Sequence, residues 1–348
     1  MNILGLITMH TYIWQLPNWH TFSWNEKDLL PLISSVRLKQ GQLIEKINNL
    51  LDDDLKKAEA IVLEQEALKT ARIEGETYNP ESVRSSIHRQ LGLSYAGLPK
   101  TERHIDGLVE VLLDAIANYK NRLNKKRLFS WHAALFPTGY SGLSKIEVGK
   151  FRTGPMQVVS GPIGREKLHY QAPPAGKISQ EMSLFLKWWH ETENQLDGVI
   201  RAGIAHFYFV TIHPFDDGNG RITRALTDMA LAQDDTLPRR YYSLSNEIIK
   251  KRKEYYSILE NTQKGTSDIT EWLTWFITCF SSALDTSEIL LTDIFAKTEF
   301  WRKNQGINID LRQKKVINKL LNAGKNKFKG GLTTRKYMSI TKISRSTA

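Results

Sequence analysis

The sequence predicts a mainly α-helical protein that carries one β-hairpin. Patterns typical of amphipathic helices recur through most of residues 54–285. The segment 148–174 differs, because it is rich in glycine and proline and contains the short β-type runs MQVVS and KLHYQ. At 348 residues the chain exceeds the size at which one hydrophobic core usually keeps growing. We therefore expect two or three domains built around a helical core.

The composition is that of a globular protein, with 41% apolar and 24% charged residues. No stretch approaches the roughly 20 uninterrupted apolar residues of a membrane helix, and residues 1–9 lack the basic start and the cleavage site of a signal peptide. The single cysteine, Cys279, excludes an intrachain disulfide, and its apolar neighbours predict a buried thiol. These features favour a soluble, cytoplasmic protein.

The first expected domain, residues 10–53, begins with a cluster of aromatic residues. Pro17 and Pro31 are expected to interrupt this segment before a helical pattern runs to Asn49. The cluster favours a small N-terminal domain packed on a larger body, with a peptide-binding surface as the alternative. Its members are Tyr12, Trp14, Trp19, Phe22 and Trp24.

A strong helix signal covers residues 54–73. One helix face holds Leu63, Ala67, Thr70 and Glu74, at spacings of four, three and four residues. Gly75 is expected to end this helix, as a glycine in the C′ position does. Further helices are expected at residues 102–122, 126–135, 179–194, 197–212, 221–233, 246–261 and 269–285.

The stretch with the richest chemistry is the polar loop that joins the expected helices 197–212 and 221–233. Gly218 and Gly220 permit close approach of the backbone. The loop leads into a helix N-terminus, where free N–H groups and the helix dipole favour anions. Arg221 and Arg224 are three residues apart, so both can face that anion site.

Two further side chains of this loop complete a reaction centre. Asp217 offers a hard oxygen ligand for Mg²⁺, which typically takes one carboxylate together with phosphate oxygens and water. His213 can act as a general base near neutral pH, although a histidine outside such a loop is more often a core residue. A base, a magnesium carboxylate, an anion cradle and two phosphate clamps together indicate transfer from a nucleotide.

The run HPFDDGNGRITR resembles the Fic-domain motif HxFx(D/E)GNGRxxR at every defined position. The matching residues are His213, Phe215, Asp217, Gly218, Asn219, Gly220, Arg221 and Arg224. The resemblance extends over about residues 10–348 and implies a Fic-type helical bundle at 54–285. It also implies a flap hairpin at 148–174 and a small preceding domain. Residues 286–348 are expected to form a linker helix followed by a basic, winged-helix-like segment.

The resemblance implies a protein adenylyltransferase. Such an enzyme transfers AMP from ATP, with Mg²⁺, to a Ser, Thr or Tyr hydroxyl of a target protein and releases pyrophosphate. The implied roles are a base at His213, a metal ligand at Asp217, a loop anchor at Phe215, α- and β-phosphate contacts from Asn219 and the 218–221 amides, phosphate contacts from Arg221, and a γ-phosphate contact from Arg224.

A second motif lies at the end of the expected helix 54–73. Thr70 to Gly75, TARIEG, resembles the family's inhibitory motif (S/T)xxxE(G/N). In the family, this glutamate reaches into the ATP site and pairs with the second motif arginine. The resemblance therefore implies that residues 54–75 form an inhibitory helix and that Glu74 competes with the γ-phosphate for Arg224.

The resemblance also implies weaker site positions and several partners. Val158 falls in the flap, where the family aligns the target peptide as an added strand. Tyr255, Tyr256 and Gln263 fall where the family contacts adenine and ribose, although the family often has Asn at the last of these positions. The implied partners are ATP, an unidentified protein target, the chain itself as a target, and a second copy in a homodimer.

The net charge of +11 belongs to one end of the chain, because residues 297–348 hold 14 Lys and Arg against two acids. Helices expected at 310–323 and 332–339 precede Ile343, where a recognition helix would begin, so the order is that of a helix-turn-helix. The chain stops at Ala348, so we expect a truncated module. DNA contact and a solvated basic tail both remain open.

The sequence is also compatible with two alternative functions. One is a nucleotide-sensing, DNA-binding regulator in which the basic tail acts and the nucleotide site only senses. The other is an enzyme of the same site that removes AMP or uses another nucleotide donor.

Overall fold

The computed structural model describes residues 12–94, 97–161, 165, 167–323, 328 and 330–344. The elements in chain order are η1 (Ile13–Gln15), α1 (Glu26–Asn48), α2 (Asp52–Ile73), α3 (Pro80–Gln90), α4 (Arg103–Ala117), α5 (Lys125–Leu135), β1 (Tyr140–Ser141), β2 (Ser144–Lys145), β3 (Gln157–Ser160), β4 (Lys167–Gln171), η2 (Ala175–Lys177), α6 (Ile178–Glu191), α7 (Gly198–Ile212), α8 (Asn219–Asp235), α9 (Leu244–Lys250), α10 (Arg252–Gln263), α11 (Thr270–Leu290), α12 (Thr292–Lys303), α13 (Leu311–Ala323) and α14 (Thr334–Thr341). The prediction of a mainly α-helical fold with a small hairpin is confirmed.

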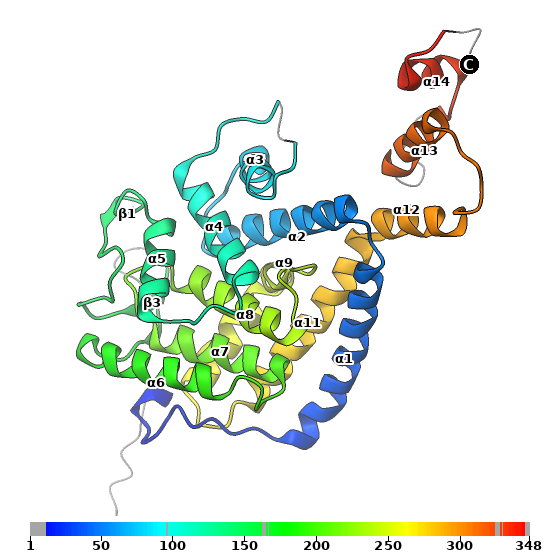
Figure 1. Cartoon of the computed structure of the whole chain (residues 1–348). Coiled ribbons are helices and arrows are strands. Elements are labelled where there is room, and N and C mark those ends of the chain that lie inside the picture. The colour runs from blue at the N-terminus through cyan, green and yellow to red at the C-terminus, as the bar shows by residue number, and fades with distance from the viewer. Residues whose placement is uncertain are drawn as a thin grey trace, which may run out of the picture.

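The centre of the molecule is the pair α7 and α8, with α11 and α1 on one side and α2 crossing near them (Figure 1). Residues 201–212 of α7 are all buried, as expected for a helix that is apolar around its whole circumference. Gly203 lets α11 approach closely, because an added Cβ would lie 2.9 Å from Leu273 and Phe276 side-chain atoms. The loop that follows α7 is therefore mounted on rigid core helices.

The end of α2 is set by its glycine. Gly75 has a φ of +86°, and the N–H of Glu76 bonds to the Ala71 carbonyl across the helix end. A left-handed backbone at this position is cheap for glycine and costly for other residues. Glu74 is the last residue before that turn, as predicted.

The N-terminal segment differs from the prediction at Pro31, which lies inside α1 instead of interrupting it. The Asn25 side chain caps α1 by accepting from the Lys27 N–H at 3.1 Å. Pro31 removes only one helix hydrogen bond, and burial of the face with Val36 and Leu43 offsets the cost.

The aromatic cluster at the start of the chain packs largely on the central helices. Trp19 and Phe22 make edge-on contacts with Tyr208 of α7, at centroid distances of 5.1 and 5.4 Å. Trp14 reaches the flap instead, where its indole N–H donates to the Gln171 carbonyl at 2.8 Å. These contacts support the core interpretation of the cluster.

The flap segment forms an antiparallel hairpin of β3 and β4, in which Val158 pairs with Tyr170. The register shifts between Val158 and Val159. A second hairpin, formed by the two-residue strands β1 and β2, was not predicted. The expected helix 246–261 is instead two helices, α9 and α10, separated at Lys251.

The C-terminal helices α13 and α14 stand apart from the helical body, joined to it through α12 (Figure 1). They coincide closely with the helices expected at 310–323 and 332–339, and α12 lies where a linker helix was expected. Residues 1–9, and most of the expected recognition helix from Ile343 onward, lie outside the described residues. No helix among the described residues has the length and apolar character needed to cross a membrane.

Candidate active site

His213 occupies the C-terminal end of α7 in a left-handed conformation, with φ 51° and ψ 60°. Its Nδ1 donates to the Val210 carbonyl at 3.0 Å, because a carbonyl can only accept. In the neutral ring, Nε2 is therefore the nitrogen with the free lone pair. Burial lowers the pKa of His213, so the ring is neutral at pH 7 and can accept a proton.

The loop after His213 is closed by the Asn219 side chain. Asn219 accepts from the Phe215 N–H at 2.9 Å and donates to the Phe215 carbonyl at 2.8 Å. Phe215 is fully buried and stacks on His132 with ring centroids 4.3 Å apart. The expected anchoring role of Phe215 fits this geometry. The Asn219 amide shapes the loop here, so a phosphate contact from this residue would come from its backbone N–H.

The anion cradle is the N-terminus of α8. Gly218 caps it with a φ of +78°, and the N–H groups of an α-helix's first turn have no acceptors within the helix. An added Cβ on Gly218 would lie 2.8 Å from the Phe136 ring, and one on Gly220 would lie 2.1 Å from Glu74 Oε1. A side chain at Gly218 would therefore clash with the Phe136 ring in a strained backbone, whereas one at Gly220 would displace the Glu74 carboxylate.

Asp217 presents the carboxylate that could hold a metal ion. One oxygen accepts from the Gly218 N–H at 2.6 Å, the other accepts from the Ser141 hydroxyl, and the side chain is 42% exposed. No group of three or more His, Cys, Asp or Glu suited to a metal occurs in the described part of the chain. One accessible carboxylate beside an anion cradle fits Mg²⁺ that arrives with nucleotide phosphates. Ser141 was missed because the β1–β2 hairpin gave no sequence signal.

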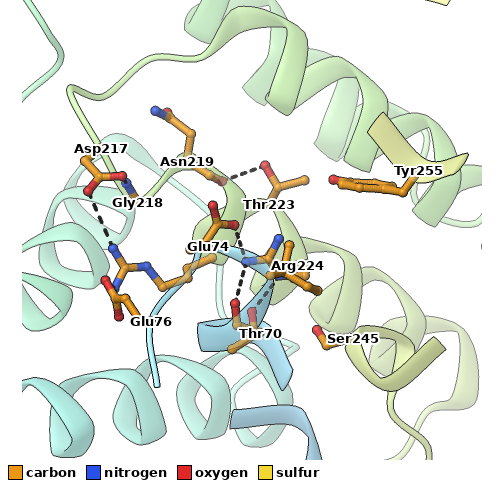
Figure 2. Close-up of polar contacts among 12 residues, drawn as sticks. Thr70, Glu74, Glu76, Asp217, Gly218, Asn219, Thr223, Arg224, Ser245 and Tyr255 are labelled. Atoms are coloured by element: carbon orange, nitrogen blue, oxygen red, sulfur yellow. Dashed lines mark hydrogen bonds and ion pairs between the residues drawn. The ribbon is translucent and has the colours of Figure 1, made fainter. Parts of the chain in front are cut away.

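Arg224 is 2% exposed and is held by the end of α2 (Figure 2). Its Nη2 donates to Glu74 Oε1 at 2.5 Å and to the Thr70 carbonyl at 3.2 Å, and its Nε donates to Thr70 Oγ1 at 2.5 Å. Both the Thr and the Glu of the TARIEG run therefore contact this one guanidinium, and Glu74 lies at the mouth of α8.

Arg221 is held by a second acid from the same segment. Its Nη1 lies 3.1 Å from Glu76 Oε1, and its guanidinium covers the Phe136 ring at 4.8 Å. Glu76 also accepts from the Tyr78 hydroxyl at 2.5 Å. Glu76 was not predicted as a site residue, although an acid two residues beyond Glu74 was a visible signal.

Two of the expected nucleotide contacts are buried in other interactions. Tyr255 is 2% exposed, and its hydroxyl bonds to His206 Nε2 at 2.9 Å. Gln263 is 4% exposed and donates to Thr211 Oγ1 at 3.3 Å. In this conformation both side chains belong to the core behind the site.

The third expected nucleotide contact, Tyr256, and the expected flap position, Val158, are more accessible. Tyr256 is 37% exposed and donates to the Ile73 carbonyl at 3.4 Å, beside Arg252, which donates to the same carbonyl at 3.1 Å. Val158 lies half-buried on β3 of the flap. Tyr256 thus contacts the end of α2 and still offers a ring surface.

The α7–loop–α8 unit, together with the β3–β4 hairpin, defines a domain of the Fic type. The Fic/DOC family model matches residues 122–231, and a model described as a domain of unknown function, DUF4172, matches residues 12–93. The match to the Fic/DOC family therefore covers residues 122–231, which include the flap hairpin, α7, the loop after it and most of α8.

Curated relatives of the chain carry a Fic name. The chain is 27% identical over 240 residues to a protein named protein adenylyltransferase Fic from Culex quinquefasciatus, covering 68% of this chain and 43% of that protein. It is 33% identical over 143 residues to a protein of the same name from Drosophila mojavensis, covering 40% and 25%. The matches thus span less than half the length of these relatives.

Two solved structures share the fold. A Fic family protein from Desulfovibrio desulfuricans G20 has a TM-score of 0.57 at 22% identity, covering 91% of this chain and 86% of that chain. A Fic domain-containing signaling protein from Bacteroides thetaiotaomicron has a TM-score of 0.56 at 19% identity, covering 75% and 97%. At these identities the likeness concerns the fold alone.

Proposed function

We propose that this chain is a protein adenylyltransferase that transfers AMP from ATP to a hydroxyl side chain of a target protein. The observation that carries the proposal is the assembly of residues 213–224, in which a neutral histidine with a free Nε2 lies at the end of α7. The anion-binding start of α8 and two buried arginines follow it. The names of the curated relatives support the same activity.

The proposed reaction is a single displacement at the α-phosphorus. His213 Nε2 takes the proton of the target hydroxyl, the hydroxyl oxygen bonds to the α-phosphorus, and the bond to the pyrophosphate oxygen breaks. The first-turn N–H groups of α8 and the two arginines bind the phosphate charge. Asp217 would hold Mg²⁺, which neutralises phosphate charge when it is bound.

We further propose that the enzyme is autoinhibited. Glu74 occupies the guanidinium of Arg224 that a γ-phosphate would need, and a carboxylate and a phosphate compete for the same donor fork. Glu76 occupies Arg221 in the same way. Both motif arginines are thus paired with acids from one helix end. In the proposed domain division, this inhibitory helix, 54–75, belongs to the Fic unit of residues 54–285, between units 10–53 and 286–348.

The test is to incubate the purified protein, its Glu74→Gly variant and a Glu74→Gly/His213→Ala variant with α-labelled ATP, Mg²⁺ and a cell lysate. We expect labelled protein bands from the Glu74→Gly variant. Loss of the base should lower transfer about 10²–10⁴-fold while ATP binding stays within a few-fold. A folded, ATP-binding Glu74→Gly protein that labels neither itself nor any lysate protein would overturn the proposal.

A further inference from the structure

Arg152 is a buried guanidinium outside the Fic motif, in the segment between β2 and β3. It is 2% exposed. Its side chain donates three hydrogen bonds, and each ends on a backbone carbonyl: His213 at 2.8 Å, Gly154 at 2.8 Å and Pro173 at 2.6 Å. A buried cation bound to backbone carbonyls is costly to desolvate. The placement of Arg152 therefore indicates a role beyond packing.

The first of these carbonyls belongs to the proposed base. His213 is held in a left-handed conformation, which is unfavourable for a residue other than glycine. Such a conformation persists only when its surroundings determine it. Arg152 fixes the loop on the C-terminal side of His213, through its Nε to the His213 carbonyl and its own N–H to the Pro214 carbonyl at 2.9 Å.

The other two carbonyls are the roots of the flap. Gly154 lies before β3 and Pro173 lies after β4, so one guanidinium ties both ends of the hairpin together. Tyr170 of β4 adds a second tie, since its hydroxyl donates to the Thr211 carbonyl at 2.7 Å in the last turn of α7. The hairpin and the backbone of His213 are therefore held together by these hydrogen bonds.

We propose that Arg152 is a positioning residue for AMP transfer, which sets the distance between His213 and the hydroxyl of a peptide held on the flap. This inference rests on the proposed function, in which His213 is the base and the flap aligns the target. The three carbonyls require the planar fork of arginine, which offers five donors, whereas the lysine ammonium cannot reproduce that spread. The groups proposed to bind ATP lie on α8 instead, where the Asn219 amide shapes the loop independently of Arg152.

The experiment compares two buried arginines in the Glu74→Gly background. Arg201 is a matched control, because it is 3% exposed and also donates to a backbone carbonyl, that of Trp189 at 2.7 Å, but it lies toward the N-terminal end of α7. The variants are Arg152→Lys, Arg152→Gln and Arg201→Lys. Each is characterised by its melting temperature, its ATP dissociation constant, and the kcat and KM of transfer.

We expect Arg152→Lys to lower kcat by about 10- to 100-fold, since a base displaced by about 1 Å can cost that much. The ATP dissociation constant should stay within about threefold of the parent value. The kcat of Arg152→Gln should fall at least as far as that of Arg152→Lys. Arg201→Lys should lower the melting temperature with little change in kcat. An Arg152→Lys protein that transfers AMP at the rate of its Glu74→Gly parent would overturn the inference, as would equal losses of kcat in Arg152→Lys and Arg201→Lys.

A second measurement keeps this inference separate from the proposed function. Amide hydrogen exchange across residues 155–161 and 167–174 should accelerate in Arg152→Lys and not in Arg201→Lys, because only the first change releases the roots of the flap. If the Glu74→Gly parent transfers no AMP, the proposed function fails. If the flap of Arg152→Lys exchanges its amide hydrogens at the parent rate, the role of Arg152 is rejected as well.

Discussion

At the scale of single residues, the protonation of His213 sets the pH dependence of the proposed reaction. Burial lowers its pKa below the ordinary value of about 6.5. The base works only in its neutral form, so the rate should hold a plateau at neutral pH and fall as the pH drops through that lowered pKa. Transfer by Glu74→Gly protein, measured from pH 5 to 8 at saturating ATP, should reach half of its plateau below about pH 6.5. A midpoint above 7 would contradict the assignment of the base.

The carboxylate of Asp217 should set the Mg²⁺ dependence of the proposed reaction. Asp217→Asn keeps the shape of the side chain and removes the charge, so the Mg²⁺ concentration for half-maximal transfer should rise about tenfold or more. Asp216→Asn is the matched control, because Asp216 is the neighbouring acid and accepts from the Glu147 N–H at 2.9 Å instead. Identical Mg²⁺ titrations for the two variants would remove Asp217 from the metal site.

At the scale of elements, the proposed inhibition acts through two acids at the end of α2 and just beyond it. In Glu74→Gly protein, Arg224 becomes available to the γ-phosphate, so the rate of transfer should rise by tens of fold. Each 1.4 kcal/mol of the interaction between Glu74 and Arg224 corresponds to about a factor of ten, and a shielded charge pair can contribute a few kcal/mol. Adding Glu76→Gln should raise it again, because Arg221 then loses its competing carboxylate. The measurement is the initial rate of AMP incorporation for each single variant and for the pair.

The same helix supplies a control for this prediction. Glu64 lies on α2 and pairs with Arg84 of α3 at 2.9 Å, remote from both motif arginines. Glu64→Gln should leave the rate of transfer at the parent level. Equal activation by Glu64→Gln and Glu76→Gln would show that any loosening of α2 releases the enzyme, and that Glu76 has no specific part in inhibition.

Elements with a strong helical period were predictable from the sequence, and so was the end of α2, because Gly75 encodes it locally. The continuation of α1 through Pro31 was not, since it depends on packing against α11. The same holds within the site. The motif residues are contiguous, whereas Ser141 and Arg152 reach the site from separate segments through tertiary contacts.

Burial explains the remaining differences at the site. Tyr255 and Gln263 were placed at the nucleotide by sequence position alone, which does not register that their polar groups bond to His206 and Thr211 in the core. Asn219 was expected on the phosphates, but its amide is the group that can close the loop on both sides of Phe215. The structure gives each of these side chains a protein partner, and their contacts with a nucleotide stay predictions.

At the scale of the whole molecule, the basic charge and the proposed active site lie in different places. Helices α13 and α14 stand apart from the body and are joined to it through α12 (Figure 1). Lys315 and Lys319 are exposed on α13, while Val316 on the same helix is buried. Charges separated by more than about 10 Å are largely screened at 0.1 M salt. The basic helices should therefore contribute little to the electrostatics of the α8 anion cradle.

Because of this separation, the exposed lysines of α13 should be dispensable for AMP transfer. In Glu74→Gly protein, Lys315→Gln combined with Lys319→Gln should leave kcat and KM for AMP transfer within about twofold, because neither side chain belongs to the site and screening removes their long-range effect. If the basic helices contact nucleic acid, the same variant should bind duplex DNA more weakly and lose about one unit of salt dependence for each phosphate contact removed. Both are measured on one preparation, by label incorporation and by fluorescence anisotropy across a salt series. A large fall in transfer with unchanged folding would show instead that the C-terminal helices serve the enzyme, as a docking surface for its protein target.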